Sequence, residues 1–193
     1  IMCMSSTHII IFHGLASRYT SKLTYIFEWL AARFATHCIF LTDHDRKYLN
    51  IFSRYTKISN YSGCAATYMS NYESTVVVTV TRSGRQKNLK YNLKEMRDVP
   101  LSLHVYGVAS HELNVNKEIN TIIESKVIFK EFDSPQNIYA NKFAFILSTF
   151  SEGFPLSILE AASHRLPLIV SNIPELQEVL GDNAIYFENN LSG

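Results

Sequence analysis

The stretch Ser148–Glu175, STFSEGFPLSILEAASHRLPLIVSNIPE, combines a strand end, a turn, a helix and a second strand. In its turn, Gly153 lets backbone N–H groups approach a ligand closely, and Pro155 fits the first turn of a helix, where no N–H is needed. Glu152 precedes the turn. Glu160 follows it, about 7 Å further along the helix axis at about 1.5 Å per residue. The two carboxylates are therefore too far apart to share a proton, and we expect a helix start that binds a ligand.

The segments around this stretch predict a parallel sheet. From Thr75 onward, six short apolar runs alternate with longer segments of helical period: TVVVTV, LSLHVY, KVIF, FAFIL, PLIV and AIYF. This alternation is typical of an α/β fold built from βα units. In the commonest doubly wound order, 3-2-1-4-5-6, the first and fourth strands are neighbours and open a crevice at their carboxyl ends. The loops after TVVVTV and FAFIL should therefore converge on one ligand site.

The N-terminal part predicts a smaller α/β segment. Two strands, HIIIF and HCIFL, flank a helix on which Leu23, Phe27, Leu30 and Phe34 recur at helical spacing, which predicts one buried face. The following polar stretch, SRYTKISNYSGCAATYMSNYES, has no clear period and indicates a linker.

We therefore expect part of an N-terminal domain at residues 1–55, a linker at 56–74 and a C-terminal domain at 75–193 that lacks its last helices. The first residue is Ile1, and a strand of buried type follows it almost at once, so we expect a fragment of a longer chain.

The composition of the chain argues against several classes of function. The 193 residues are 47% hydrophobic, which is enough for a real core, and 18 basic against 17 acidic residues give a net charge of +1. Interspersed charges argue against a nucleic-acid partner. Three widely spaced cysteines indicate neither a zinc site nor a disulfide framework and favour the cytoplasm. No apolar run is long enough to span a membrane, but peripheral association with the inner face of the cell membrane stays open.

The loop after TVVVTV carries Arg82, Arg85 and Lys87 around Gly84. Such a turn can hold a phosphate-bearing ligand by charge-assisted hydrogen bonds. Taken alone, three basic residues in a polar loop are more simply interpreted as a solvated surface.

Glu152 and Glu160 would repel a diphosphate but would accept hydrogen bonds from hydroxyl groups. A ligand with hydroxyls on either side of its phosphates, such as a nucleotide sugar, fits both loops. The simpler alternatives are a surface glutamate for Glu160 and a favourable charge near a helix N-terminus for Glu152.

At this point the residues resemble a family. SEGFPLSILEAASHRLPLIVSNIPELQEVLGD resembles the donor-site signature, with its E-x7-E motif, of the retaining family 4 glycosyltransferases, the group 1 enzymes of GT-B fold. TRSGRQKN matches the Gly-Arg-x-x-x-x-Lys loop of that family, with Arg82 and Lys87 in register. KISNYSG resembles the segment that enters the C-terminal domain, and IIIFHG resembles the end of the N-terminal, acceptor-side domain.

The resemblance implies two Rossmann-like domains and a role for each matching residue. Arg82 and Lys87 would hold the donor diphosphate and offset the charge of the leaving group without a metal. Glu152, with the backbone of Gly153 and Phe154, would bind the donor sugar, and Pro155 would complete this turn.

Two further roles follow from the resemblance. Glu160 would bind the nucleotide ribose, and His13 would lie across the cleft near the reacting sugar. Without the resemblance, His13 is more simply interpreted as a loop histidine at a strand end.

Two positions depart from the family pattern. Thr81 and Arg165 stand where the family has glycine, and a Cβ there can strain a turn or crowd a ligand. The chain also lacks the N-terminal glycine-rich loop of the family and most of that domain.

Three functional hypotheses result. The first is a retaining glycosyltransferase, or a fragment of one, that transfers a sugar from a UDP- or GDP-type donor to a glycan or lipid-linked acceptor in cell-surface polysaccharide synthesis, with no metal or other cofactor. The second is a non-catalytic remnant that at most binds nucleotide sugar. The third and weakest is a nucleotide-sugar epimerase, which needs an acid/base pair that His13 alone does not supply.

Overall fold

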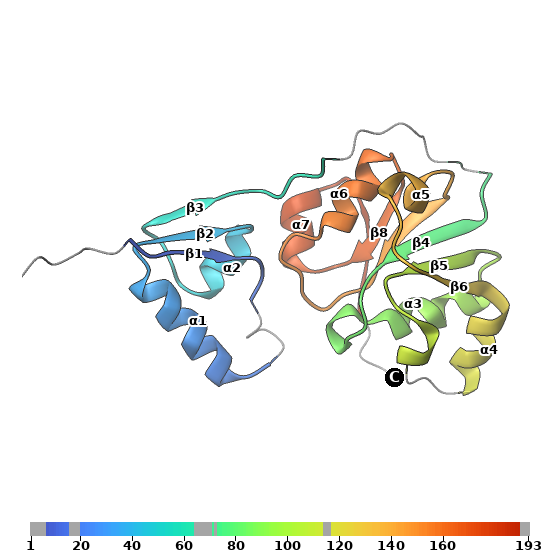
Figure 1. Cartoon of the computed structure of the whole chain (residues 1–193), viewed down its shortest axis with the longest axis horizontal. Coiled ribbons are helices and arrows are strands. Elements are labelled where there is room, and N and C mark those ends of the chain that lie inside the picture. The colour runs from blue at the N-terminus through green and yellow to red at the C-terminus, as the bar shows by residue number, and fades with distance from the viewer. Residues whose placement is uncertain (1–6, 16–19, 64–70, 72, 114–116, 190–193) are drawn as a thin grey trace, which may run out of the picture. The chain divides into compact units, whose positions relative to one another are not determined.

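The computed structural model describes residues 7–15, 20–63, 71, 73–113 and 117–189, shown in Figure 1. Contacts between Cα atoms divide the chain into two compact units. The first unit comprises Ile1–Asn60, Ser151–Phe154 and Pro174–Val179, and the second comprises Tyr61–Phe150, Pro155–Ile173 and Leu180–Gly193.

The first unit holds a small parallel sheet of order β1-β2-β3. Its elements follow one another as β1 (Ile9–Phe12), α1 (Lys22–Phe34), β2 (His37–Phe40), α2 (Asp43–Tyr48) and β3 (Tyr55–Lys57). The rings of Phe12 and Phe40 stack with centroids 5.0 Å apart, and Cys38 and Leu49 are buried beside them. Strand β3, which extends into the predicted linker, was missed because three residues are too few to show a period.

Helix α1 does not bury the face that its apolar spacing predicted. Leu23, Phe27 and Phe34 are 61%, 63% and 79% exposed. The buried residue of α1 is Ala32, and half-buried Tyr25 packs against the same core. The prediction was wrong for these three residues because α1 meets the core through Ala32 and Tyr25, which lie on another face of the helix; Leu30, the fourth predicted residue, is half-buried.

The second unit holds a six-stranded parallel sheet of order β6-β5-β4-β7-β8-β9. The strands are β4 (Val76–Val80), β5 (Ser102–Tyr106), β6 (Val127–Lys130), β7 (Ala144–Leu147), β8 (Leu168–Ser171) and β9 (Ile185–Phe187). All six predicted strands are present, and their order along the sheet is 3-2-1-4-5-6, which confirms the predicted α/β doubly wound fold.

Helices and short 3-10 turns connect these strands. They are η2 (Arg85–Lys87), α3 (Leu89–Glu95), η3 (Met96–Asp98), η4 (Ser110–Glu112), α4 (Lys117–Lys126), α5 (Pro135–Tyr139), α6 (Leu156–Ser163) and α7 (Pro174–Leu180). Helix α5 has Ser134 as its N-cap and Pro135 in its first turn. Helix α7 begins at Pro174, and most of it is grouped with the first unit.

The helices of the second unit cover both faces of its sheet, as Figure 1 shows. On one face, α3 and α4 contribute Leu93 and Ile122 to a cluster with Leu103 of β5. On the other face, Tyr139 of α5 packs against Phe145 of β7, with ring centroids 6.0 Å apart. Helices on opposite faces follow β4 and β7, which is the arrangement that opens a crevice at their carboxyl ends.

None of the helices in the described ranges combines the length and apolar character that a membrane-spanning helix needs.

Candidate functional site

The candidate site of the second unit lies where β4 and β7 end side by side. The two strands are hydrogen-bonded neighbours, with Val77 opposite Ala144 and Val78 opposite Phe145. Because both strands are parallel, their carboxyl ends meet at one edge of the sheet. The loops that the sequence analysis selected therefore start from adjacent points.

The loop after β4 carries the basic residues. Arg82 is exposed and Lys87 is half-buried, while the side chain of Arg85 lies outside the described part. Gly84 has φ +150°, a conformation that glycine adopts without strain. Asn88, which precedes α3, has a left-handed backbone with φ 39° and ψ 35°. The loop thus has two residues with positive φ between Arg82 and α3, one on either side of η2.

Three residues after β7 hold this basic loop in place. Ser148 Oγ donates to the carbonyl oxygen of Asn88 at 2.8 Å. Thr149 Oγ1 and the backbone N–H of Phe150 donate to the carbonyl oxygen of Gln86 at 3.2 Å and 2.9 Å. Ser148 and Thr149 are buried, so water does not compete strongly for these bonds. The structure therefore joins the basic loop directly to the start of the loop that contains Glu152.

A second set of hydrogen bonds ties the β7 loop to β8 and to the segment after β9. The backbone N–H of Thr149 donates to Ser171 Oγ at 2.8 Å, and Ser171 Oγ donates to Asn189 Oδ1 at 3.0 Å. Asn189 Nδ2 donates to the carbonyl oxygen of Thr149, and Asn88 Nδ2 lies 3.4 Å from Asn189 Oδ1. Sequence reasoning missed Ser171 and Asn189, because no local pattern reveals partners in distant segments.

Helix α6 follows the Gly-Phe-Pro turn and opens without a side-chain cap. Pro155 is its N-cap, with φ −70° and ψ 122°, and makes no capping hydrogen bond. It stands one position earlier than the expected first helical turn. The uncapped N–H groups of Leu156 and Ser157 at this positive helix end can receive an anionic or hydroxyl-bearing ligand.

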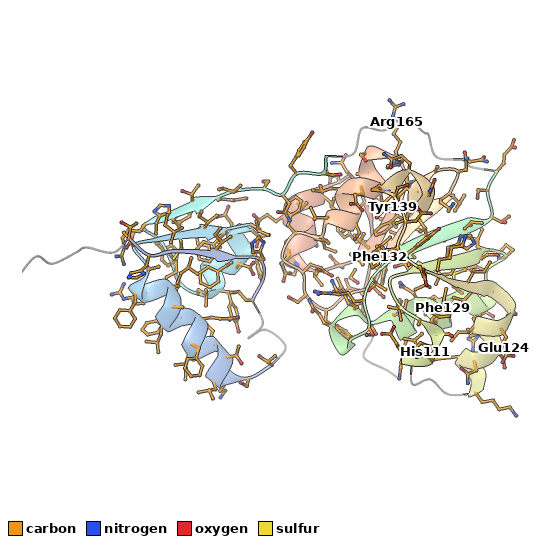
Figure 2. All side chains as sticks on the ribbon, viewed as in Figure 1. His111, Glu124, Phe129, Phe132, Tyr139 and Arg165 are labelled. Atoms are coloured by element: carbon orange, nitrogen blue, oxygen red, sulfur yellow. The ribbon has the colours of Figure 1, made fainter. Side chains whose placement is uncertain are left out.

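Glu160 lies in the second turn of α6. One oxygen of its half-buried carboxylate, Oε2, accepts a hydrogen bond from the hydroxyl of Tyr139 at 2.9 Å. Tyr139 comes from α5, as its label in Figure 2 shows. Sequence reasoning did not select Tyr139, because its distance of 21 residues from Glu160 carries no motif.

The remaining predicted residues belong to the first unit by their contacts. Glu152 is buried, with 6% of its surface exposed, whereas His13, after β1, is exposed. A Cβ built on Gly153 would lie 2.0 Å from the carbonyl oxygen of His13 and 3.0 Å from the nitrogen of Gly14. Only glycine fits at position 153, and within this unit the structure brings His13 and Gly153 together.

Two further hydrogen bonds hold the same short segment. Asn60 Nδ2 donates to the carbonyl oxygen of Phe154 at 2.6 Å. Ser151 Oγ donates to Glu175 Oε1 at 3.2 Å. Both bonds lie within the first unit, so Phe154 has a fixed backbone carbonyl there.

The two departures from glycine behave differently. Thr81 is buried and has no positive φ, so its backbone is not strained. The positive φ lies instead at Gly107, +87°, where a Cβ would come within 2.4 Å of the carbonyl oxygen of Thr81. Arg165 has φ 58°, in the left-handed region that favours glycine, and its side chain is exposed. The expected strain is therefore present at Arg165 and absent at Thr81.

In the part of the chain that the structure describes, no cluster of three or more His, Cys, Asp and Glu side chains could hold a metal ion.

Comparison with known proteins finds a matching family model and several similar proteins. A family model described as glycosyl transferases group 1 matches residues 68–192. The chain is 30% identical over 88 residues to the O-antigen biosynthesis glycosyltransferase WclY of Escherichia coli, which covers 43% of this chain and 25% of the relative. It is 42% identical over 53 residues to an O-antigen chain mannosyltransferase B of Escherichia coli, covering 28% of this chain and 14% of the relative. The chain thus spans a quarter or less of these two relatives.

A solved structure shares the fold. A variant of S. aureus TarM in complex with fondaparinux, α-GlcNAc-glycerol and UDP aligns with a TM-score of 0.74. The alignment covers 95% of this chain and 41% of TarM at 20% sequence identity. Identity at this level establishes similarity of fold alone.

Proposed function

The chain belongs to the glycosyl transferases group 1 family, and from this premise we propose that it carries the donor-binding half of a retaining glycosyltransferase. Its substrate would be a nucleotide-diphosphate sugar of the UDP or GDP type. The sugar would pass to a glycan or lipid-linked acceptor in cell-surface polysaccharide synthesis. The curated relatives named for O-antigen synthesis support this assignment of pathway class.

One observation carries the proposal: the residues after β7 bind the basic loop after β4 through partly buried hydrogen bonds. Ser148, Thr149 and Phe150 all donate to backbone oxygens of that loop. The cationic bend and the uncapped start of α6 thus follow two adjacent strands at one edge of the sheet. A diphosphate needs both positive charge and backbone N–H donors, and this edge offers them from adjacent strands.

The proposed chemistry assigns a step to each group. The acceptor oxygen forms a bond to the anomeric carbon of the donor as the bond from that carbon to the diphosphate oxygen breaks. Arg82 and Lys87 stabilise the negative charge that moves onto the leaving diphosphate. No metal is needed for this step in the proposal.

The donor sugar and ribose have their own proposed partners. Glu152 and the backbone of Gly153 and Phe154 bind the sugar hydroxyls. His13 lies near the reacting sugar, and Glu160 accepts hydrogen bonds from the ribose. A carboxylate suits this task because it accepts hydrogen bonds from hydroxyl groups with either oxygen.

Calorimetric titration of this chain with UDP, GDP and their sugar conjugates tests the proposal. We expect binding of one nucleotide series, weakened about tenfold or more in Lys87→Ala by loss of a charge-assisted hydrogen bond. Lys90→Ala is the matched control, because it removes the same charge from an exposed position on α3 and should leave binding unchanged. Absence of binding, or equal losses in both variants, would reject the proposed donor site.

A second candidate is a non-catalytic nucleotide-sugar binder. The left-handed backbone of Arg165, at a position where the family has glycine, favours it. Sugar transfer by this chain that disappears in Glu152→Ala would rule it out, whereas donor binding without transfer would support it.

A further inference from the structure

We infer that Tyr139 is a positioning residue that fixes the carboxylate of Glu160 for the ribose, so that the site prefers ribonucleotides over nucleotides that lack the ribose hydroxyls. The inference rests on the proposed function, and it deepens that function by adding a residue and a substrate preference.

A hydrogen bond joins the side chains of Tyr139 and Glu160. The hydroxyl of Tyr139 donates to Glu160 Oε2 at 2.9 Å. Among the described residues, the second oxygen, Oε1, has no hydrogen-bond partner. The carboxylate is thus held through one oxygen, while the other keeps its capacity to accept hydrogen bonds from ligand hydroxyls.

The ring of Tyr139 is held in place by its surroundings. Its side chain is fully buried, at 0% exposed. Its ring lies 5.5 Å from the ring of His164 and 6.0 Å from that of Phe145, measured between centroids. A donor on such a fixed ring defines where Oε2 must be, and a close-packed interior resists displacement of that ring.

The backbone of Glu160 is held as well. Its carbonyl oxygen accepts a hydrogen bond from Ser163 Oγ at 2.7 Å and lies 2.8 Å from His164 Nδ1. Because a carbonyl oxygen can only accept, the hydrogen of the His164 ring must be on Nδ1 in this contact. His164 therefore contacts both the backbone of Glu160 and the ring of Tyr139, and the three residues form one packed group.

Fixing the carboxylate matters because a free glutamate side chain loses rotamer freedom when it binds a ligand. Side chains that are ordered beforehand avoid that cost, so the same hydrogen bond contributes more to affinity. A site built to accept hydrogen bonds from hydroxyls also rejects analogues that lack them, because its acceptor then stays unpaired. The Tyr139–Glu160 pair should therefore act on the ribose and not on the phosphates.

The test is a cycle of two changes, one in the protein and one in the ligand. Wild-type chain and Tyr139→Phe are titrated with UDP or GDP and with the corresponding 2′,3′-dideoxynucleotide. We expect the wild type to bind the ribonucleotide about tenfold or more tightly, as for a hydrogen bond to a charged group. Tyr139→Phe should lose most of this preference, while its affinity for the dideoxynucleotide stays unchanged.

Tyr186→Phe is the matched control. It removes a tyrosine hydroxyl that donates to the carbonyl oxygen of Gly181 at 2.7 Å, in a different part of the second unit. It should keep the full ribose preference. Equal weakening of both ligands by Tyr139→Phe, or an unchanged preference, would overturn the inference, because a merely structural tyrosine affects both ligands alike.

Glu160→Asp keeps the inference testable if Tyr139→Phe does not fold. The shorter side chain keeps the charge but cannot meet Tyr139 and the ribose from the same position, so the ribose preference should fall. Full preference in this variant would also overturn the inference. Absence of all nucleotide binding in the wild type would reject the proposed function and this inference together, whereas intact wild-type binding with no effect of Tyr139 would reject this inference alone.

Discussion

The two parallel sheets of this chain differ in how their faces are covered. In β4, the neighbours Val77 and Val78 point to opposite faces, and they are 4% and 0% exposed. In β1, Ile9 and Ile11 share one face, and they are 58% and 52% exposed. Parallel sheets normally carry helices on both faces. The second unit meets this requirement with its own helices. The apolar strand pattern therefore predicted the strands correctly in both units, but it predicted their burial correctly only in the second unit.

The largest expected effect is the difference in the free energy of unfolding between a substitution in a covered strand and one in an exposed strand. Leu103→Ala removes a fully buried side chain from β5, and we expect it to lower the free energy of unfolding by about 2–5 kcal/mol, the usual cost of a core cavity. Ile11→Ala removes a side chain that is already half in water and should cost less than about 1 kcal/mol. Urea unfolding followed by circular dichroism measures both values. Equal costs would show that the exposed face of β1 is covered in solution.

The next effect concerns the polar edge of the second sheet. Ser171→Ala removes the acceptor of the buried Thr149 N–H, so we expect a loss of about 1–3 kcal/mol, the cost of leaving a buried donor without a partner. Ser125→Ala is the matched control, because its hydroxyl donates to the carbonyl oxygen of Thr121 on the exposed side of helix α4, and its removal should change stability by about 0.5 kcal/mol or less. The free energies of unfolding of the two variants, measured against the wild type, test this expectation. Similar losses would show that the edge network adds no stability.

The third expected effect is a dependence of stability on pH that comes from His104 in the second unit. Burial, together with the charges of Lys130 and Lys142, lowers the pKa of His104 in β5 to about 4 from its ordinary value of 6.5. Between these values the unfolded chain binds the proton and the folded chain does not, so stability falls as the pH drops through this window. We expect the loss to be about 1–2 kcal/mol, allowing for the partial exposure of the ring.

His104→Gln tests this expectation, because glutamine does not titrate. The free energy of unfolding at pH 7 and at pH 4.5 should differ less in the variant than in the wild type. An unchanged difference would show that other groups cause the pH dependence.

The sequence predicted the second unit well because its signals are local and repeated. Six apolar runs with helical segments between them leave few alternatives, and the commonest doubly wound order placed the loops that carry Arg82 and Glu152 after neighbouring strands. The first unit was predicted less well. Three-residue β3 is too short to show a period, and the apolar spacing of α1 does not say which face meets the sheet.

The supporting residues of the candidate site could not be predicted in the same way. Tyr139, Ser171 and Asn189 act through hydrogen bonds to residues far away along the chain. Their types, a tyrosine in a short helix and small polar residues near strand ends, are common on any protein surface. Only the fold brings them to Glu160 and Thr149.

The smallest expected effect compares strain in the two units. Arg165, in the second unit, and Arg54, in the first, are exposed arginines with φ 58° and 57°. A left-handed backbone destabilises a residue with a Cβ by about 1–2 kcal/mol. Substitution by glycine removes this cost, but glycine also gives the unfolded chain more freedom, which offsets part of the stabilisation. Arg165→Gly and Arg54→Gly should each raise the free energy of unfolding by about 0.5–1 kcal/mol, measured in urea.

Arg165→Ala and Arg54→Ala are the controls, since they remove the charge but keep the Cβ and should not stabilise. Because backbone strain is local, the two glycine variants should gain similar amounts even though the two sheets are covered so differently. A gain in only one unit would mean that the surroundings of that turn, and not its backbone conformation, set the cost.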